Sequence, residues 1–220
     1  MVLRTKIVLL MHPKEWRRER CGTGRLTCLN IADAELLPGI AFDDHPRVRQ
    51  LIDDPDNFPV LLYPGKGSID LSESKQTGRQ APDGRMIADG LTAATRLRTA
   101  ASGRRITAFL VDATWACSKA VLRESPGLLA LPRLMFTPQT PSRWIIKRQP
   151  GPLCLSTLET VHELLCALEA AGMEDYPDKS RLLDVFSRMQ EYQIERAVAG
   201  GKPRHFAKHP EATKAGPEAR

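Results

Sequence analysis

The stretch from Ile106 to Trp115, ITAFLVDATW, joins an apolar run to a carboxylate, a hydroxyl and an indole. Ile106 to Val111 is short, apolar and partly β-branched, which predicts a strand buried on both faces. The residues from Trp115 onward predict a helix that stops at Pro126. Asp112 therefore lies at the carboxyl end of a strand, in the turn before a helix, where α/β proteins place their chemistry.

Two structural interpretations of this turn stand beside a functional one. An Asp before a helix is often an N-cap, and a lone Trp is often buried as core filling. The four residues from Asp112 to Trp115 alone do not show whether this turn caps a helix or takes part in catalysis. The other segments of the chain must therefore decide.

Apolar segments on both sides of this stretch predict an alternation of strands and helices. The predicted strands are Lys6 to Met11, Pro59 to Tyr63, Arg133 to Phe136 and a very short one from Leu153 to Leu155. The predicted helices are Pro46 to Ile52, Asp89 to Ala101, one opened by a capping box of Ser156 and Glu159, and Asp178 to Val198 with Leu182, Val185, Phe186, Met189 and Tyr192 inward. This alternation indicates an α/β fold, with a mainly parallel sheet flanked by helices.

Composition sets the broad limits. A chain of 220 residues, 42% of them hydrophobic, can bury one substantial core, so we expect a single domain over residues 1–200 and a basic, disordered tail over residues 201–220. Five irregularly spaced cysteines predict reduced thiols in the cytoplasm and neither a disulfide framework nor a metal site. No apolar run approaches the ~18 residues of a membrane span. The net charge of +6 permits a polyanionic partner without identifying one.

Five short elements occur in a fixed order between Met11 and about Ala171. They are His12-Pro13-Lys14-Glu15, Thr23-Gly24-Arg25, Leu61-Leu62-Tyr63-Pro64, Asp112-Ala113-Thr114-Trp115 and Leu155-Ser156-Thr157-Leu158-Glu159. Together they resemble the DTW-domain family, which takes its name from the Asp-x-Thr-Trp element. That family includes tRNA-uridine aminocarboxypropyltransferases and is related to the SPOUT class of RNA-modifying enzymes.

The resemblance implies both a fold and a reaction. The fold would be SPOUT-like, with a trefoil knot in the C-terminal half, which pattern alone would never suggest. The reaction would transfer the 3-amino-3-carboxypropyl group of S-adenosylmethionine to N3 of a uridine in tRNA and release methylthioadenosine. Two alternatives stay open: a SPOUT-type RNA methyltransferase, and a non-catalytic RNA-binding relative. The oligomeric state is not predicted.

The resemblance also suggests roles for individual residues. Asp112 would be a general base or orient the N3–H group, Thr114 would hold the cofactor or the base, and Trp115 would either stack on a ring or brace the turn. The residues expected to bind S-adenosylmethionine are Leu62, Tyr63, Pro64, Gly65, Leu155, Ser156 and Thr157. Those expected to contact RNA are Arg25, Arg143, Lys147 and Arg148. The remaining motif residues are His12, Glu15, Thr23 and Glu159, for which structural roles such as helix capping are equally open, and no metal is expected.

Overall fold

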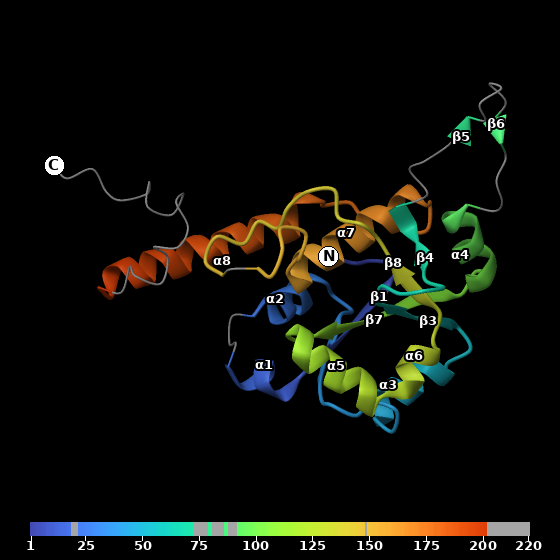
Figure 1. The fold of residues 1–220 in the computed structure, drawn as a ribbon, viewed down its shortest axis with the longest axis horizontal. Helices are drawn as coiled ribbons and strands as arrows, with labels where there is room; N and C mark the ends of the chain where they lie inside the picture. The colour runs from blue at the N-terminus through green and yellow to red at the C-terminus, as the bar shows by residue number, and fades with distance from the viewer. Residues whose placement is uncertain (19–21, 73–78, 81–85, 88–91, 148, 202–220) are drawn as a thin grey trace.

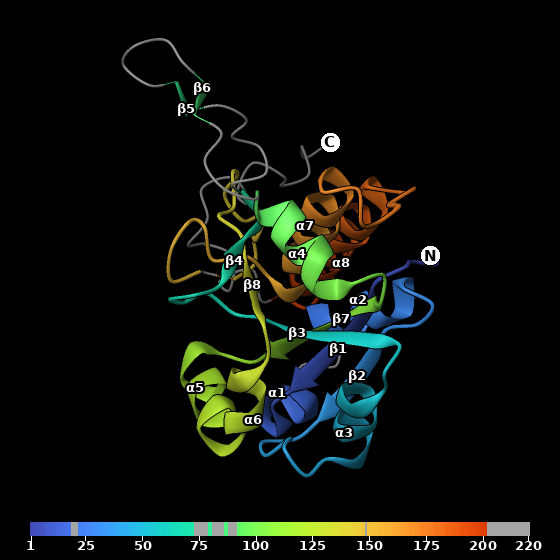
Figure 2. The ribbon, with the colours of Figure 1, turned by 90° about the vertical axis from the view of Figure 1, so that its right-hand side faces the viewer.

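The computed structural model describes residues 1–18, 22–72, 79–80, 86–87, 92–147 and 149–201 of the chain. At its centre lies a six-stranded sheet in which every pair of neighbouring strands is parallel (Figures 1 and 2). In spatial order the strands are β2 (Glu35–Pro38), β1 (Lys6–Met11), β7 (Arg105–Asp112), β3 (Asn57–Leu62), β8 (Arg133–Met135) and β4 (Ile69–Asp70). The predicted α/β fold with a parallel sheet is confirmed.

Helices cover both faces of this sheet. On one face lie α2 (Thr23–Asn30), α4 (Ala93–Ala101), α7 (Thr157–Ala170) and α8 (Ser180–Ala199) (Figure 1). On the other lie α1 (Pro13–Arg18), α3 (Pro46–Asp53), α5 (Trp115–Glu124) and α6 (Pro126–Ala130). A small antiparallel pair, β5 (Arg79–Gln80) and β6 (Met86–Ile87), stands apart from the main sheet.

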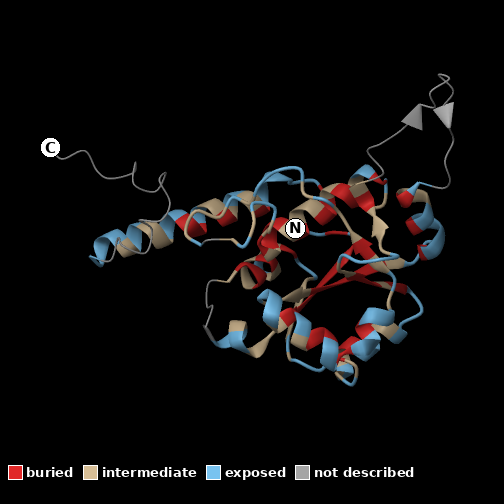
Figure 3. Ribbon diagram, viewed as in Figure 1, coloured by how far each residue is buried: buried red, intermediate tan, exposed pale blue. Residues whose placement is uncertain are grey.

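The core consists of two apolar clusters separated by the sheet. Alternate residues of β1 point to opposite faces, so Ile7 and Leu9 pack with α7 and α8, while Val8 and Leu10 pack with α3 and α5. The central strands are buried on both faces, as their continuous apolar sequences predict (Figure 3). None of the helices in the described ranges is long and apolar enough to cross a membrane.

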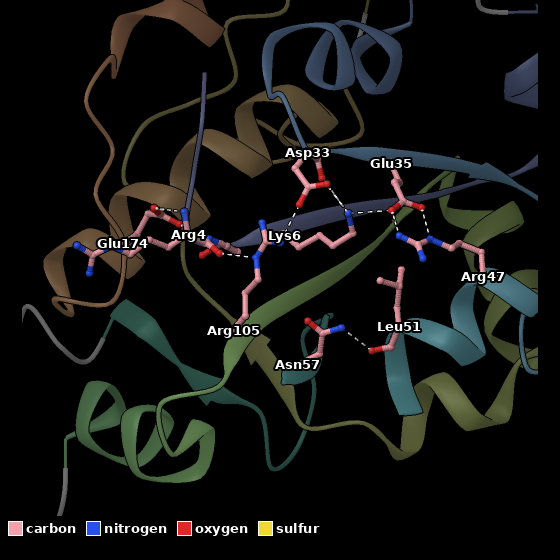
Figure 4. Close-up of polar contacts among 10 residues, drawn as sticks. Arg4, Lys6, Asp33, Glu35, Arg47, Leu51, Asn57, Arg105 and Glu174 are labelled. Carbon is pink, nitrogen blue, oxygen red and sulfur yellow. Dashed lines mark hydrogen bonds and ion pairs between the residues drawn. The ribbon is translucent and has the colours of Figure 1, made fainter. Parts of the chain in front are cut away.

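The amino-terminal edge of the sheet is closed by a network of charged side chains (Figure 4). The buried ammonium of Lys6 lies 2.8 Å from both Asp33 and Glu35, and Arg105 pairs with Asp33 at 2.8 Å. Hydrogen bonds from Arg47, and then from Lys6, lower the pKa of Glu35 to about 2 against the opposing effect of burial. The charges of Lys6, Asp33, Glu35 and Arg105 are thus paired with one another.

Several sequence predictions need correction. Residues 153–155 form no strand, because the chain turns at Gly151, whose carbonyl accepts a hydrogen bond from Cys154 N at 3.1 Å. Pro126 begins α6 as well as ending α5, as a proline in the first turn of a helix allows. Tyr192 is 60% exposed and not inward, because the end of α8 projects beyond the sheet (Figure 1). The tail over residues 202–220 lies outside the described residues, and the knot stays a prediction.

Candidate active site

A pocket of about 760 Å³ opens where the carboxyl ends of β3, β7 and β8 meet. Its wall includes residues 62–64 at the end of β3, residues 113–115 after β7, and residues 153–155 with Thr157 at the start of α7. Three motifs that are far apart in the sequence therefore share one cavity. Its volume falls in the range of ~300–1,000 Å³ typical of small-molecule sites.

The lining is uncharged and largely apolar. Aliphatic, aromatic and proline side chains supply most of it, and hydroxyl and amide groups come from residues such as Thr157, Thr160 and Gln149. No charged side chain is among the described residues that line the pocket. Of the predicted cofactor residues, Leu62, Tyr63, Pro64, Leu155 and Thr157 line the cavity, whereas Gly65 and Ser156 are neighbours of lining residues. Such a wall suits a ligand with a large apolar or aromatic surface and a few polar groups.

Asp112 stands just behind this wall. It is the last residue of β7, and its Oδ1 accepts a hydrogen bond of 2.6 Å from the hydroxyl of Thr157. The N-cap of α5 is Thr114, whose side chain makes no capping bond. The N-cap interpretation of Asp112 is therefore wrong, and its carboxylate is directed to the start of α7 instead.

Thr114 and Trp115 form part of the pocket itself. Thr114 is exposed, and Trp115, the first residue of α5, is 54% exposed. An indole that faces both a cavity and solvent is not core filling, so that interpretation is also wrong. Its position suits a planar ligand stacked on the ring.

A loop over residues 137–156, here called the pocket loop, connects β8 to α7 and supplies much of the lining. Glu159, only 3% exposed, fixes this loop. Its carboxylate accepts hydrogen bonds from Ser142 Oγ at 2.9 Å, Arg143 N at 2.6 Å and Ser156 N at 2.8 Å. The predicted capping box of Ser156 and Glu159 is confirmed, and the same carboxylate also holds the pocket loop in place.

Gln190 of α8 supports the pocket loop from a second side. It is 2% exposed, accepts a hydrogen bond from Ile145 N at 2.7 Å and donates one to Arg143 O at 3.0 Å. No sequence signal pointed to Gln190. Its partners lie 45 and 47 residues earlier in the chain, so only the folded structure brings them together.

The His-Pro-x-Glu element builds the turn from β1 into α1. His12 O accepts hydrogen bonds from Glu15 N and Trp16 N, and His12 N donates to Asp112 O at 3.2 Å. The ring Nδ1 of His12 accepts a hydrogen bond from Lys14 N at 3.1 Å. These contacts give His12 a structural role, which ties α1 to the end of β7. Glu15 lies in the first turn of α1, where a negative charge favours the helix dipole.

The Thr-Gly-Arg element begins α2. Thr23 is buried, and its carbonyl accepts a hydrogen bond from Thr27 Oγ1. Arg25 lies over the ring of Trp16, with its guanidinium carbon 3.8 Å from the ring centroid, and donates to Trp16 O at 2.9 Å. Arg25 thus shares an aromatic surface patch with Trp16, close to the motifs that end β1 and β7.

The other predicted RNA contacts belong to the pocket loop. The side chains of Arg143 and Lys147 are exposed, and the Lys147 ammonium lies 5.3 Å from the ring centroid of Trp144. Arg148 lies outside the described residues. Within the described ranges, no group of three or more His, Cys, Asp and Glu side chains is arranged to hold a metal ion.

Comparison with known proteins agrees with this geometry. The model of the DTW domain matches residues 1–194, so the chain belongs to the DTW-domain family. The chain is also 28% identical over 208 residues to a Drosophila melanogaster protein named tRNA-uridine aminocarboxypropyltransferase 2. That alignment covers 92% of this chain and 70% of the relative. No solved structure matches the chain with significance.

Proposed function

We propose that this member of the DTW-domain family transfers the 3-amino-3-carboxypropyl group of S-adenosylmethionine to N3 of a uridine in tRNA. The by-product would be methylthioadenosine. The observation that carries the proposal is the union of three family motifs around one uncharged pocket at the carboxyl edge of the sheet. The named activity of the Drosophila relative supports the same substrate and the same group.

The pocket wall fits the donor. Apolar side chains such as Leu62, Leu155 and Phe136 suit the adenine ring, while Thr157 and Gln149 provide polar contacts. The donor supplies a sulfonium that activates all three attached carbons. The protein must therefore select one carbon by orientation, and a pocket loop fixed by Glu159 and Gln190 provides a rigid wall for doing so.

The acceptor would enter beside Trp115. N3 of uridine carries a weakly acidic proton and is a poor nucleophile until that proton is removed, which calls for a carboxylate near the reacting atom. Asp112 is the carboxylate that the site offers, through its contact with Thr157. The exposed ring of Trp115 would stack on the uracil or on the adenine.

The RNA backbone would meet basic residues of α2 and of the pocket loop. Arg25 on α2, together with Arg143 and Lys147 of the pocket loop, would neutralise phosphates and give affinity without sequence choice. Arg148 and the basic tail belong to the same proposal. So do a transferase domain over residues 1–200, a SPOUT-like and knotted topology, and a cytoplasmic location.

The reaction is tested with purified protein, unmodified tRNA and S-adenosylmethionine labelled either in the methyl carbon or in the carboxyl carbon. Carboxyl label in the RNA, with no methyl label, is the expected result. Methyl label alone in the RNA would replace the proposal with a methyltransferase. No label from either donor, with retained tRNA binding, would favour a non-catalytic RNA-binding protein.

A further inference from the structure

We infer that Asp112 acts on the acceptor through the hydroxyl of Thr157, which accepts the N3 proton while passing its own proton to the carboxylate. This inference rests on the proposed function. It makes Thr157 the catalytic contact and Asp112 a positioning residue that keeps the Thr157 oxygen ready to accept a proton.

The geometry separates the two residues by their access to the ligand. Thr157 is the first residue of α7 and lines the pocket, whereas Asp112 is not among the described lining residues. The Thr157 Oγ1 to Asp112 Oδ1 distance of 2.6 Å is typical of a hydroxyl bonded to an ionised carboxylate. Thr157 is therefore the group through which the carboxylate reaches the cavity.

The hydrogen bond to Asp112 determines whether the Thr157 hydroxyl can donate to the ligand or only accept from it. A Thr hydroxyl has one donor and two acceptor lone pairs, and an ionised carboxylate can only accept. The proton of Thr157 is thus committed to Asp112, and its oxygen offers lone pairs to the pocket. The N3–H of uracil is a donor, which makes it the complementary partner.

Two other hydroxyls at the pocket, those of Ser118 and Thr160, are placed differently. Ser118 Oγ donates to Thr114 O at 3.1 Å, a backbone carbonyl. Thr160 lines the same cavity one turn further along α7, and no contact with a carboxylate is seen for it in the described part of the chain. Thr157 therefore differs from Ser118 and Thr160 in having a carboxylate as its hydrogen-bond partner.

Gly24 holds the carboxylate from its other side. A Cβ built on Gly24 would lie 2.0 Å from Asp112 Oδ2 and 3.0 Å from its Cγ. Asp112 thus occupies the space that any larger residue at this position would need. This contact explains why the Thr-Gly-Arg element has a glycine here. A residue with a Cβ would displace the Asp112 carboxylate from the position in which it bonds Thr157.

The transfer step then balances. The N3–H bond breaks, its proton moves to Thr157 Oγ1, and the Thr157 proton moves to Asp112 Oδ1. The freed N3 electron pair forms the new N–C bond, and the electron pair of the broken C–S bond stays on sulfur in neutral methylthioadenosine. Solvent later takes the proton from Asp112 and restores the site.

Among the described residues, titratable side chains near Thr157 or Asp112 come from α2, from the turn after β1 and from α7. Burial, with smaller effects of Asp112 and Glu35, raises the pKa of the Cys28 thiol on α2 to about 11, so Cys28 stays neutral near physiological pH. His12 after β1 contacts Asp112 through its backbone N–H. On α7, the Glu159 carboxylate is occupied by donors of the pocket loop. None of these groups replaces Thr157 as the contact with the pocket.

The test compares Thr157→Val, which keeps the shape and removes the hydroxyl, with Thr157→Ser, which keeps the hydroxyl. A third variant, Thr160→Val, removes a hydroxyl of the same pocket wall for which the described part of the chain shows no carboxylate partner. For each protein, kcat/KM for aminocarboxypropyl transfer is measured across pH ~6 to ~9, together with the KM for S-adenosylmethionine. General-base catalysis contributes roughly 10²- to 10⁴-fold. Thr157→Val is expected to lose a factor of this order in kcat, and Thr157→Ser to recover most of it.

The pH profile separates this role from simple packing. Without the relay only uridine that is already ionised can react, so kcat/KM of Thr157→Val should rise close to tenfold per pH unit, while wild type and Thr160→Val rise less steeply. Equal profiles and equal losses for the two Val variants would overturn the inference and leave the proposed function intact. A wild-type protein that transfers no aminocarboxypropyl group would overturn the proposed function itself.

Discussion

Replacement of Gly24 by Ala is the sharpest test of the contact between α2 and the end of β7. An ordinary van der Waals contact needs about 3.4 Å, and the new Cβ would begin 2.0 Å from Asp112 Oδ2, so the carboxylate would have to move by about 1.4 Å. Because O–H···O bonds span only about 2.5–3.0 Å and the Thr157 bond already measures 2.6 Å, a shift or rotation of that size would break or misalign it. The substitution should therefore separate Asp112 from Thr157.

The expected free-energy change combines three effects. A charge-assisted hydrogen bond contributes ~1.5–3 kcal/mol, overpacking costs ~1–3 kcal/mol, and Ala in place of a helical Gly returns ~1 kcal/mol. Gly24→Ala should therefore lower the free energy of unfolding by about 1.5–5 kcal/mol. In an Asp112→Ala background the clash is gone, and the same change should be neutral or stabilising by up to ~1 kcal/mol.

Urea unfolding of the wild type, the two single variants and the double variant measures this difference as a coupling energy. The helix-propensity effect is common to both backgrounds, so the contact predicts a coupling of about 2.5–6 kcal/mol, the sum of the hydrogen bond and the overpacking. An equal effect of Gly24→Ala in both backgrounds would refute the reasoning, because the cost would then come from α2 alone and not from the carboxylate.

Three further outcomes follow from other contacts. Glu35→Gln should cost about 1–2 kcal/mol at neutral pH, because a pKa lowered to about 2 stabilises the fold above pH ~4.5; in wild type this stabilisation is lost as pH falls toward 2, so unfolding curves of the two proteins should converge in acid. Glu159→Gln replaces one of the two accepting oxygens by an NH2 donor, so either Arg143 N or the pair Ser142 Oγ and Ser156 N loses its acceptor. Hydrogen exchange in the pocket loop and the KM for S-adenosylmethionine should therefore rise, whereas Glu163→Gln on the same helix should change neither. Trp115→Ala should weaken tRNA binding by about 5- to 150-fold without lowering stability, since stacking contributes ~1–3 kcal/mol and the ring is exposed; unchanged affinity would show that the ring only braces its turn.

Local sequence patterns predicted the framework of this protein well. The apolar runs of β1 and β7 have no other stable environment than the middle of a parallel sheet, and the pairing of Ser156 with Glu159 marks the start of α7 by itself. The position of three motifs directly after predicted strands also placed their loops at the carboxyl edge of the sheet, because the carboxyl ends of parallel strands lie together. Each of these predictions depends either on residues that are close together in the sequence or on the general rule for parallel strands.

The features that sequence analysis missed depend on residues far apart. Gln190 appears as a polar interruption of an apolar stripe, and its burial makes sense only beside the backbone of the pocket loop. Gly24 and Asp112 are far apart in the sequence and come into contact only in the folded chain. Tyr192 continues the apolar pattern of α8, but the helix extends past the body that would have buried it (Figure 1). Periodicity predicts which face of a helix is apolar, but not how much of that face packs against the rest of the protein.

Nucleoside mass analysis of tRNA from cells that lack the gene tests the central claim most directly. We predict that 3-(3-amino-3-carboxypropyl)uridine is lost from tRNA, and that it returns when wild-type protein is supplied but not with Thr157→Val. The account would be contradicted if this nucleoside persisted at its normal level while a methylated nucleoside disappeared.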